Sequence, residues 1–304
     1  MKTTIKLFSL LFLLSITIHA QEYQIKEISN ISYYEDGSEF DTDKTQLNLV
    51  IPEGVENAPV FIWIGQGAWA YVDRHQEMGF CRSLAKRGVI VASVGHRLSP
   101  ALLGKKKIEE GIKHPEHVKD IAQSIKWLVE NSDEYGFKTE NLFVGGFSSG
   151  AHLAALIAMD DFYLNNLGLS TDLIRGIVPV GGGFDIPHYK QDLIKEDPAY
   201  EFNHINVVFG ETHEEHLNAS PTEFIDNLKA SVLIISEKDT YRYNKIFEDL
   251  LIEKQYPDFQ VINVHNMTHG GLWMDFIKNE KSIFTDYIAD FLIKKNKPEL
   301  KIQN

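Results

Sequence analysis

The chain has 304 residues, of which 43% are apolar and 24% charged, with 21 glycines and 10 prolines. This composition is typical of a folded globular protein with a sizeable core, and it excludes the fibrous, collagenous, disordered and disulfide-stapled classes. The formal net charge of −13 repels phosphate backbones and anionic lipid surfaces, so we expect no nucleic-acid partner.

Residues 1–20 have the pattern of a cleavable signal peptide. Two lysines precede an apolar run at 7–18, and Ala20 supplies the small residue expected at the cleavage position. A run of about a dozen residues is shorter than the roughly 20 needed to cross a bilayer. That length disfavours the alternative interpretations, a membrane anchor or a first core strand. We therefore expect a secreted or periplasmic mature chain, residues 21–304, without a membrane span.

After the leader, the hydrophobic pattern predicts first a hairpin and then an alternation of strands and helices. Strands at 28–34 and 47–51 flank an Asp36-Gly37 turn, which is typical of an antiparallel hairpin. The strands expected next are 59–64, 89–94, 141–147, 174–180, 232–235 and 260–264, and the expected helices are 75–87, 117–131, one from 151, 241–254 and 272–293. This alternation indicates an α/β fold with a mostly parallel central sheet flanked by helices.

The segment 185–218 is polar and rich in aromatic residues and histidines, so we expect it to form a small cap above the carboxyl edge of the sheet. Within it, His213 and His216 stand three apart, which falls short of the His-Glu-x-x-His spacing of zinc sites, and no third ligand is in view. Cys81 is the single cysteine and fits a buried apolar position. We expect no metal site and no cofactor.

The most specific motif is Gly146-Phe147-Ser148-Ser149-Gly150, which lies between a predicted strand and a predicted helix. Glycines two residues before and two after Ser148 allow the sharp, strained turn that lifts a serine hydroxyl above a sheet. The alternative interpretation is a glycine-rich turn that only caps the helix. The strand-turn-helix context favours Ser148 as a nucleophile, with the Ser149 N–H at the helix start as an oxyanion donor.

A serine nucleophile needs a base, and the base needs a group that orients it. Asp239 follows one predicted strand, and His269 follows the next in a loop that contains glycines. The order Ser148, Asp239, His269 is the one expected when the elbow lies on a middle strand of such a sheet. Two alternatives remain: a turn or helix-capping role for Asp239, and His265, closer to the strand end, as the base. We prefer His269 because it sits deeper in a loop that can reach Ser148.

The loop after the strand predicted at 59–64 reads Gly65-Gln66-Gly67-Ala68-Trp69. A loop at this place supplies a further oxyanion donor in elbow-type hydrolases, so the amides of Gly67 and Ala68 are candidates. The structural alternative is that the glycines only permit a tight turn with Trp69 packed beneath it, and both interpretations can hold together.

Together these motifs resemble the α/β-hydrolase fold, in the esterase branch that includes hormone-sensitive-lipase-like enzymes, feruloyl and acetyl esterases and kynurenine formamidases. The elbow reads GGFSSGAHLAAL where those families tend towards GxSAGGHLA. The resemblance continues through HRLSP at 96–100, HPEHVKDIAQSIKWL at 114–128, ASP at 219–221 and the acid and histidine loops, and it covers roughly 46–292. The chain departs from the family at 65–69, where His-Gly-Gly followed by Gly or Tyr and then Trp is replaced by GQGAW.

The motifs and the resemblance imply a serine carboxylic-ester hydrolase that forms an acyl-enzyme on small or carbohydrate-linked esters without a cofactor. Two other functions stay open. One is a kynurenine-formamidase-like amidase or a peptidase on the same triad; the other is a non-catalytic binding protein that retains the fold, suggested by the altered loop at Gly65 and Gln66. Aromatic residues able to line an acyl or aryl pocket are Trp69, Tyr71, Phe184, Tyr189, Tyr200, Phe202 and Trp273.

Overall fold

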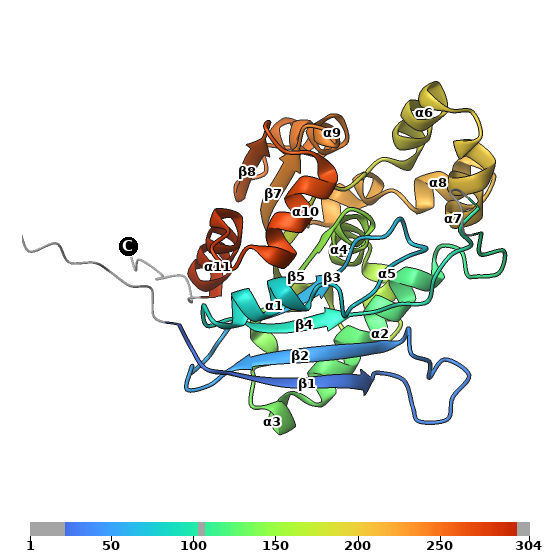
Figure 1. The fold of residues 1–304 in the computed structure, drawn as a ribbon. Coiled ribbons are helices and arrows are strands. Elements are labelled where there is room, and N and C mark those ends of the chain that lie inside the picture. Colours follow the sequence, from blue (N-terminus) through green and yellow to red (C-terminus); the bar gives the residue numbers. More distant parts are fainter. Residues whose placement is uncertain (1–21, 103–106, 297–304) are drawn as a thin grey trace, which may run out of the picture.

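The computed structural model describes residues 22–102 and 107–296, so the predicted signal peptide lies outside the described residues. Within these residues an eight-stranded sheet has the order β1-β2-β4-β3-β5-β6-β7-β8 (Figure 1). The strands are β1 (Ile25–Ser32), β2 (Gln46–Pro52), β3 (Val60–Ile64), β4 (Ile90–Val94), β5 (Leu142–Phe147), β6 (Ile174–Val180), β7 (Ser231–Glu237) and β8 (Phe259–Val264). β2 pairs antiparallel with β1 and with β4, and the other neighbours pair in parallel. The predicted hairpin and the mostly parallel sheet are confirmed.

Helices cover both faces of this sheet, as the alternating pattern predicts. The α-helices are α1 (Met78–Ala85), α2 (Glu116–Glu130), α3 (Ser132–Tyr135), α4 (Ser149–Met159), α5 (Asp161–Asn165), α6 (Ile186–Glu196), α7 (Val207–Phe209), α8 (His213–Asn218), α9 (Tyr241–Glu253), α10 (His269–Lys278) and α11 (Ile283–Asn296). Three 3₁₀ turns, η1 (Thr139–Asn141), η2 (Thr171–Leu173) and η4 (Pro221–Asn227), and one π-helix, η3 (Glu201–Asn206), complete the described elements. None of the helices in this part of the chain is long and apolar enough to cross a membrane.

Two hydrophobic cores lie on opposite faces of the sheet because side chains alternate along each strand. In β3, Ile62 and Ile64 belong to the core that includes residues of α2, α4 and α9, whereas Phe61 and Trp63 belong to the core that includes residues of α1, α10 and α11. The strands β3 to β7 are therefore buried on both sides, whereas the edge strand β8 is mostly half-buried. Only their carboxyl ends and the loops that follow are left to build a site.

Residues 185–218 form the short elements α6, η3, α7 and α8. In Figure 1 the helices α6, α7 and α8 stand together at one end of the molecule, away from α11. Asp185 caps α6 by accepting a hydrogen bond from the His188 amide at 2.8 Å. We refer to these residues as the cap segment.

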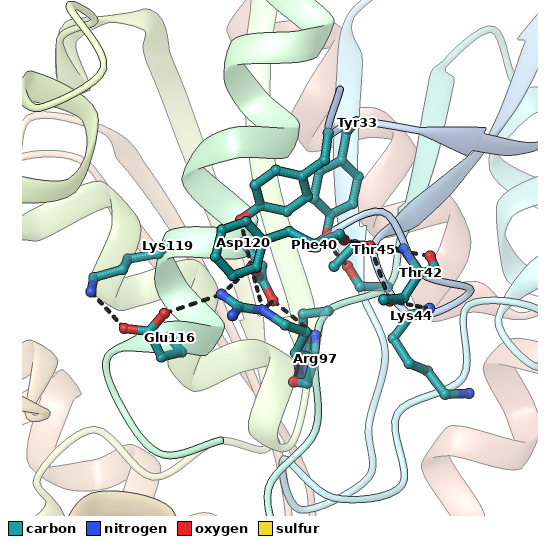
Figure 2. A network of polar contacts seen from close by, with 12 residues as sticks. Tyr33, Phe40, Thr42, Lys44, Thr45, Arg97, Glu116, Lys119 and Asp120 are labelled. Atoms are coloured by element: carbon teal, nitrogen blue, oxygen red, sulfur yellow. Dashed lines mark hydrogen bonds and ion pairs between the residues drawn. The ribbon is translucent and has the colours of Figure 1, made fainter. Parts of the chain in front are cut away.

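A polar network joins the loop between β1 and β2 to α2 (Figure 2). Asp120 in α2 is fully buried and accepts hydrogen bonds from Arg97 Nη2 at 2.8 Å and from the Tyr34 hydroxyl at 2.7 Å. The Arg97 guanidinium carbon lies 4.7 Å from the centroid of the Phe40 ring, and its Nη2 lies 3.1 Å from Glu116 Oε2. Arg97 follows β4, so this network holds the segment after β4 and the β1–β2 loop against α2.

The predicted helix boundaries differ most from the structure at two places. The helix expected at 75–87 begins only at Met78, and the closing helix expected at 272–293 is two helices, α10 and α11. The break falls at Asn279, whose φ of −103° and ψ of 95° are not helical. Asp275 supports the break by accepting hydrogen bonds from Asn279 Nδ2 at 2.7 Å and from Ser282 Oγ at 2.5 Å.

Candidate active site

Ser148 stands on a strained turn between β5 and α4. Its φ of 57° and ψ of −115° lie outside the regions that residues with a side chain usually occupy. A Cβ on Gly146 would lie 2.4 Å from the Gly150 carbonyl carbon, and a Cβ on Gly150 would lie 2.0 Å from the Ile64 oxygen. Only glycine therefore fits on either side of the serine, which is the reason the motif has this spacing. The predicted elbow geometry is present.

Ser149 is the first residue of α4, and its amide lies at the amino end of the helix, where N–H groups have no acceptor within the helix. Its side chain is 1% exposed. The residue lines the same cavity as Ser148. The Ser149 amide can therefore stabilise negative charge that develops beside Ser148.

His269 begins α10, with Thr268 as the N-cap residue. Its side chain is partly exposed and lines the cavity that Ser148 lines. Its ring packs on Phe147, the residue before Ser148, with centroids 4.8 Å apart. The competing histidine, His265, is exposed and packs its ring on Tyr241 at 6.0 Å. Of the two histidines, the geometry places His269 beside the elbow.

The carboxylate that orients His269 belongs to Glu237, the last residue of β7. His269 Nδ1 lies 2.8 Å from Glu237 Oε1, and the glutamate is 1% exposed. Oε1 also accepts a hydrogen bond from the Thr240 hydroxyl at 2.6 Å, and Oε2 accepts one from the Asp239 amide at 2.6 Å. Burial raises the pKa of the Glu237 carboxyl, but the hydrogen bonds from His269, Thr240 and the Asp239 amide outweigh burial and leave that pKa lowered. Glu237 therefore faces the histidine as a carboxylate.

The assignment of Asp239 as the orienting acid is corrected by these contacts. Asp239 Oδ2 accepts a hydrogen bond from the backbone N–H of His269 at 2.8 Å, so it holds the start of α10 rather than the imidazole. The physical reason lies in the length of the strand: β7 extends to Glu237, two residues further than the apolar run at 232–235 indicates. The strand end therefore carries the glutamate, and Asp239 falls in the turn that follows. One sequence feature could have indicated Glu237: it is an acidic residue directly after the apolar run at 232–235 and Ser236, two residues before Asp239.

The loop after β3 has an unusual backbone, with φ of 147° at Gly67, 50° at Ala68 and 60° at Trp69. The Gly67 carbonyl accepts hydrogen bonds from the amides of Ala70 at 2.9 Å and Tyr71 at 2.8 Å. A Cβ on Gly67 would lie 2.5 Å from the Val72 nitrogen, so this position requires glycine. Strain of this kind at a non-glycine residue such as Ala68 persists only where surrounding contacts impose it.

Of the three predicted oxyanion residues, Ser149 lines the cavity of about 660 Å³ that holds Ser148 and His269. Ala68 lines a neighbouring cavity of about 290 Å³, and Gly67 lines neither. Ser149 therefore lines the same cavity as Ser148, whereas Ala68 lines the neighbouring cavity, which shares Tyr189 and Leu193 with the first.

Aromatic side chains from the loop after β3, the cap segment and α9 line the larger cavity. Trp69 and Tyr189 contact each other edge to face with centroids 6.4 Å apart, and Tyr189 and Tyr243 do so at 5.1 Å. The Trp69 indole donates to His152 Nδ1 at 3.3 Å, which fixes the tryptophan against α4. Of the other predicted pocket aromatics, Phe184 is fully buried in the core.

The His213–His216 segment has a structural role. Thr212 and Glu215 form a capping box at the start of α8, and His216 Nε2 lies 3.0 Å from the Gly210 carbonyl. Within residues 22–102 and 107–296 no group of three or more His, Cys, Asp or Glu side chains is placed to hold a metal ion.

Residues 47–242 match the model of the BD-FAE family. The chain belongs to the BD-FAE family. Esterase LipC of Mycobacterium tuberculosis is 29% identical to this BD-FAE member over 133 residues, 42% of this chain and 30% of LipC. The kynurenine formamidase of Salmo salar is 22% identical over 211 residues, 67% of this chain and 62% of the formamidase. The chain therefore spans less than two thirds of the length of these curated relatives.

Solved structures show the same fold. A truncated carbohydrate esterase from gut microbiota superposes with a TM-score of 0.69 at 18% identity, covering 91% of this chain and 98% of the esterase. An esterase of Rhizomucor miehei superposes with a TM-score of 0.69 at 20% identity, covering 91% of this chain and 86% of that esterase. The fold of this BD-FAE protein is the α/β-hydrolase fold.

Proposed function

We propose that this BD-FAE protein is a serine carboxylic-ester hydrolase that works through an acyl-enzyme. The observation that carries the proposal is the 2.8 Å contact between His269 Nδ1 and Glu237 Oε1 at the cavity that Ser148 lines. Glu237 fixes the ring so that Nδ1 carries the proton and Nε2 is left as the base.

In the proposed reaction, Ser148 Oγ attacks the ester carbonyl and His269 Nε2 takes its proton. The tetrahedral oxyanion is stabilised by the Ser149 amide together with an amide of the loop after β3, from Gly67 or Ala68. Collapse of this intermediate expels the alcohol, which receives the proton from His269. A water molecule, deprotonated by the same histidine, then attacks the acyl-enzyme carbonyl. Collapse of this second intermediate breaks the bond to Ser148 Oγ, which takes the proton back from His269, and the carboxylic acid is released.

We further propose small or carbohydrate-linked esters as the substrates and export as the fate of the chain. Trp69, Tyr189 and Tyr243 line the cavity with aromatic rings. Such rings can pack against an aromatic or sugar ring of a substrate, and tyrosine hydroxyls can hydrogen-bond to the polar groups of a sugar. The leader pattern at 1–20 supports a secreted or periplasmic location.

The experiment that tests the proposal is hydrolysis of aryl acetates by the wild type and by Ser148→Ala. We expect turnover to fall by about a million-fold in the variant, because a triad serine acts as a unit with its base. Ser170→Ala, at the half-buried N-cap of η2, is the matched control and should retain full activity. Undiminished hydrolysis by Ser148→Ala would contradict the proposal. Failure of a fluorophosphonate to label Ser148 in the folded wild type would instead favour a non-catalytic binding protein.

A second candidate function is amide hydrolysis on the same residues. It is favoured by the similarity to kynurenine formamidases, which extends over 67% of this chain. The wild type should be compared on an N-formyl aryl amine and the matched aryl acetate. A larger kcat/KM for the formamide would select this second candidate.

A further inference from the structure

Glu77 is a buried carboxylate that the proposed mechanism does not use. It directly precedes α1 and is 1% exposed. Its Oε2 accepts a hydrogen bond from Trp63 Nε1 at 2.9 Å, and its Oε1 accepts one from Trp273 Nε1 at 3.0 Å. The backbone N–H of Gln66 donates to the same carboxylate. Three N–H donors therefore converge on this buried carboxyl group, whose two oxygens accept from all of them.

The three donors belong to different parts of the candidate site. Trp63 lies in β3, directly before the loop that supplies Gly67 and Ala68, and Gln66 lies in that loop. Trp273 lies in α10, one helical turn after His269. We call residues 65–69, the loop after β3, the oxyanion loop. The Glu77 carboxylate therefore joins the oxyanion loop to α10, the helix that His269 begins.

Gly65 makes room for this arrangement. A Cβ on Gly65 would lie 2.9 Å from Glu77 Cγ and 3.0 Å from Oε1. A side chain at this position would push the carboxylate away from the Gln66 amide. Gly65 and Gln66 are also the positions where the chain departs from the His-Gly-Gly pattern of the resembling families.

We propose that Glu77 is a positioning residue that fixes the oxyanion loop relative to His269. The inference rests on the proposed ester hydrolysis. Glu77 does not touch the substrate; it acts through the Gln66 amide on one side and the Trp273 indole on the other. Burial raises the pKa of the Glu77 carboxyl, and the hydrogen bonds from Trp63, Trp273 and the Gln66 amide lower it in part. Those three donors have no lone pair to offer, so they are satisfied only by an acceptor at this position.

The test is Glu77→Gln in the full-length protein. Glutamine keeps the shape but replaces one acceptor oxygen with an NH₂ group, which faces an N–H donor. We expect kcat on an aryl acetate to fall about 10- to 100-fold, because a small displacement of an oxyanion donor weakens binding of the transition state. We expect KM to stay within about twofold, because the ground state uses these amides less. Glu280→Gln, which removes an exposed carboxylate 3.3 Å from Lys86 Nζ, is the matched control and should leave both constants unchanged.

Hydrogen exchange of the loop amides at 65–69 gives a readout that does not depend on turnover. Faster exchange there in Glu77→Gln, with the rest of the chain protected, supports the inference. If Glu77→Gln does not fold, Trp273→Phe removes one donor from a partly exposed position and should show the same loss of kcat at constant KM. Unchanged kcat and unchanged exchange in the folded variant would overturn the inference. If the wild type hydrolyses no ester, the proposed function fails, and loop exchange in Glu77→Gln still decides whether Glu77 holds the loop.

Discussion

The Nδ1 atom of His269 lies 2.8 Å from Oε1 of Glu237. Both residues stand at element ends: Glu237 closes β7, and His269 opens α10. Because the glutamate is buried and the histidine is partly exposed, the pair places an oriented imidazole in the wall of the cavity that Ser148 also lines. Asp239 meets the same histidine only at its backbone.

This pairing predicts that Glu237→Gln is far more damaging than Asp239→Asn. A glutamine at 237 can donate to Nδ1 and so favours the wrong tautomer of His269, for which a loss of about 10⁴-fold in kcat is expected. Asp239→Asn keeps a carbonyl oxygen for the His269 amide, so we expect a loss below about 10-fold. Steady-state kinetics on an aryl acetate, with both variants shown to be folded, checks the ranking. A reversed ranking would return the orienting role to Asp239.

The elbow predicts a large steric cost at Gly150. Its added Cβ would lie 2.0 Å from the Ile64 oxygen and 2.7 Å from the Gly65 oxygen, both backbone atoms that cannot rotate away. We expect Gly150→Ala to lower the free energy of unfolding by about 3 kcal/mol or more. Gly270→Ala is the control, since nothing lies within 4 Å of its added Cβ, and it should change stability by less than about 1 kcal/mol. Urea unfolding of both variants measures the difference; equal stabilities would show that the β3 end can move.

The sheet could be predicted from the sequence because a strand that is buried on both faces is a short, nearly continuous apolar run. Such runs alternate with helical patterns along this chain. The elbow could be predicted because a strained serine turn needs glycines at fixed places. Both features are local, so a window of a few residues contains all the information. The break at Asn279 is less visible, since Phe276 and Phe284 on either side continue an apolar pattern that suits one long helix.

The partner of His269 could not be fixed in the same way, because it depends on where β7 ends and on which side chain reaches across to α10. Glu237 closes the strand, Asp239 falls in the turn two residues later, and both are acids. The distance from each carboxylate to the His269 imidazole decides between the two acids, and Glu237 and His269 are 32 residues apart in the sequence. The role of Glu77 could not be predicted from the sequence for the same reason. Trp63 and Trp273 both donate hydrogen bonds to its carboxylate only when α10 packs against the sheet.

Buried histidines predict a loss of stability in mild acid. Burial lowers the pKa of His152 to about 3 and the pKa values of His114 and His204 to about 4. In the unfolded chain these groups return towards 6.5 and take up protons that the folded protein does not. The free energy of unfolding should therefore fall as the pH drops from about 6.5 towards 4, by about 1.4 kcal/mol per pH unit for each proton.

His204→Gln should make this slope shallower by up to one proton between those pH values. His213→Gln makes the same substitution at an exposed residue of α8 and is the matched control. Urea unfolding at half-unit steps from pH 7.5 to 4.5 measures the slopes. Identical slopes for the wild type and His204→Gln would contradict a neutral buried His204.

The network around Asp120 predicts a strong dependence of stability on a residue far from the cavity (Figure 2). Asp120 is fully buried and accepts from the Arg97 side chain at 2.8 Å and from the Tyr34 hydroxyl at 2.7 Å. Asp120→Asn removes the charge that compensates a largely buried guanidinium, so we expect a loss of about 3 kcal/mol in the free energy of unfolding. Asp172→Asn makes the same chemical change in an exposed pair with Lys229, where a much smaller loss is expected because solvent screens the pair. If urea unfolding shows the same loss of stability for Asp120→Asn and Asp172→Asn, another carboxylate compensates the Arg97 charge. Glu116 can do so, because its Oε2 already lies 3.1 Å from Arg97 Nη2.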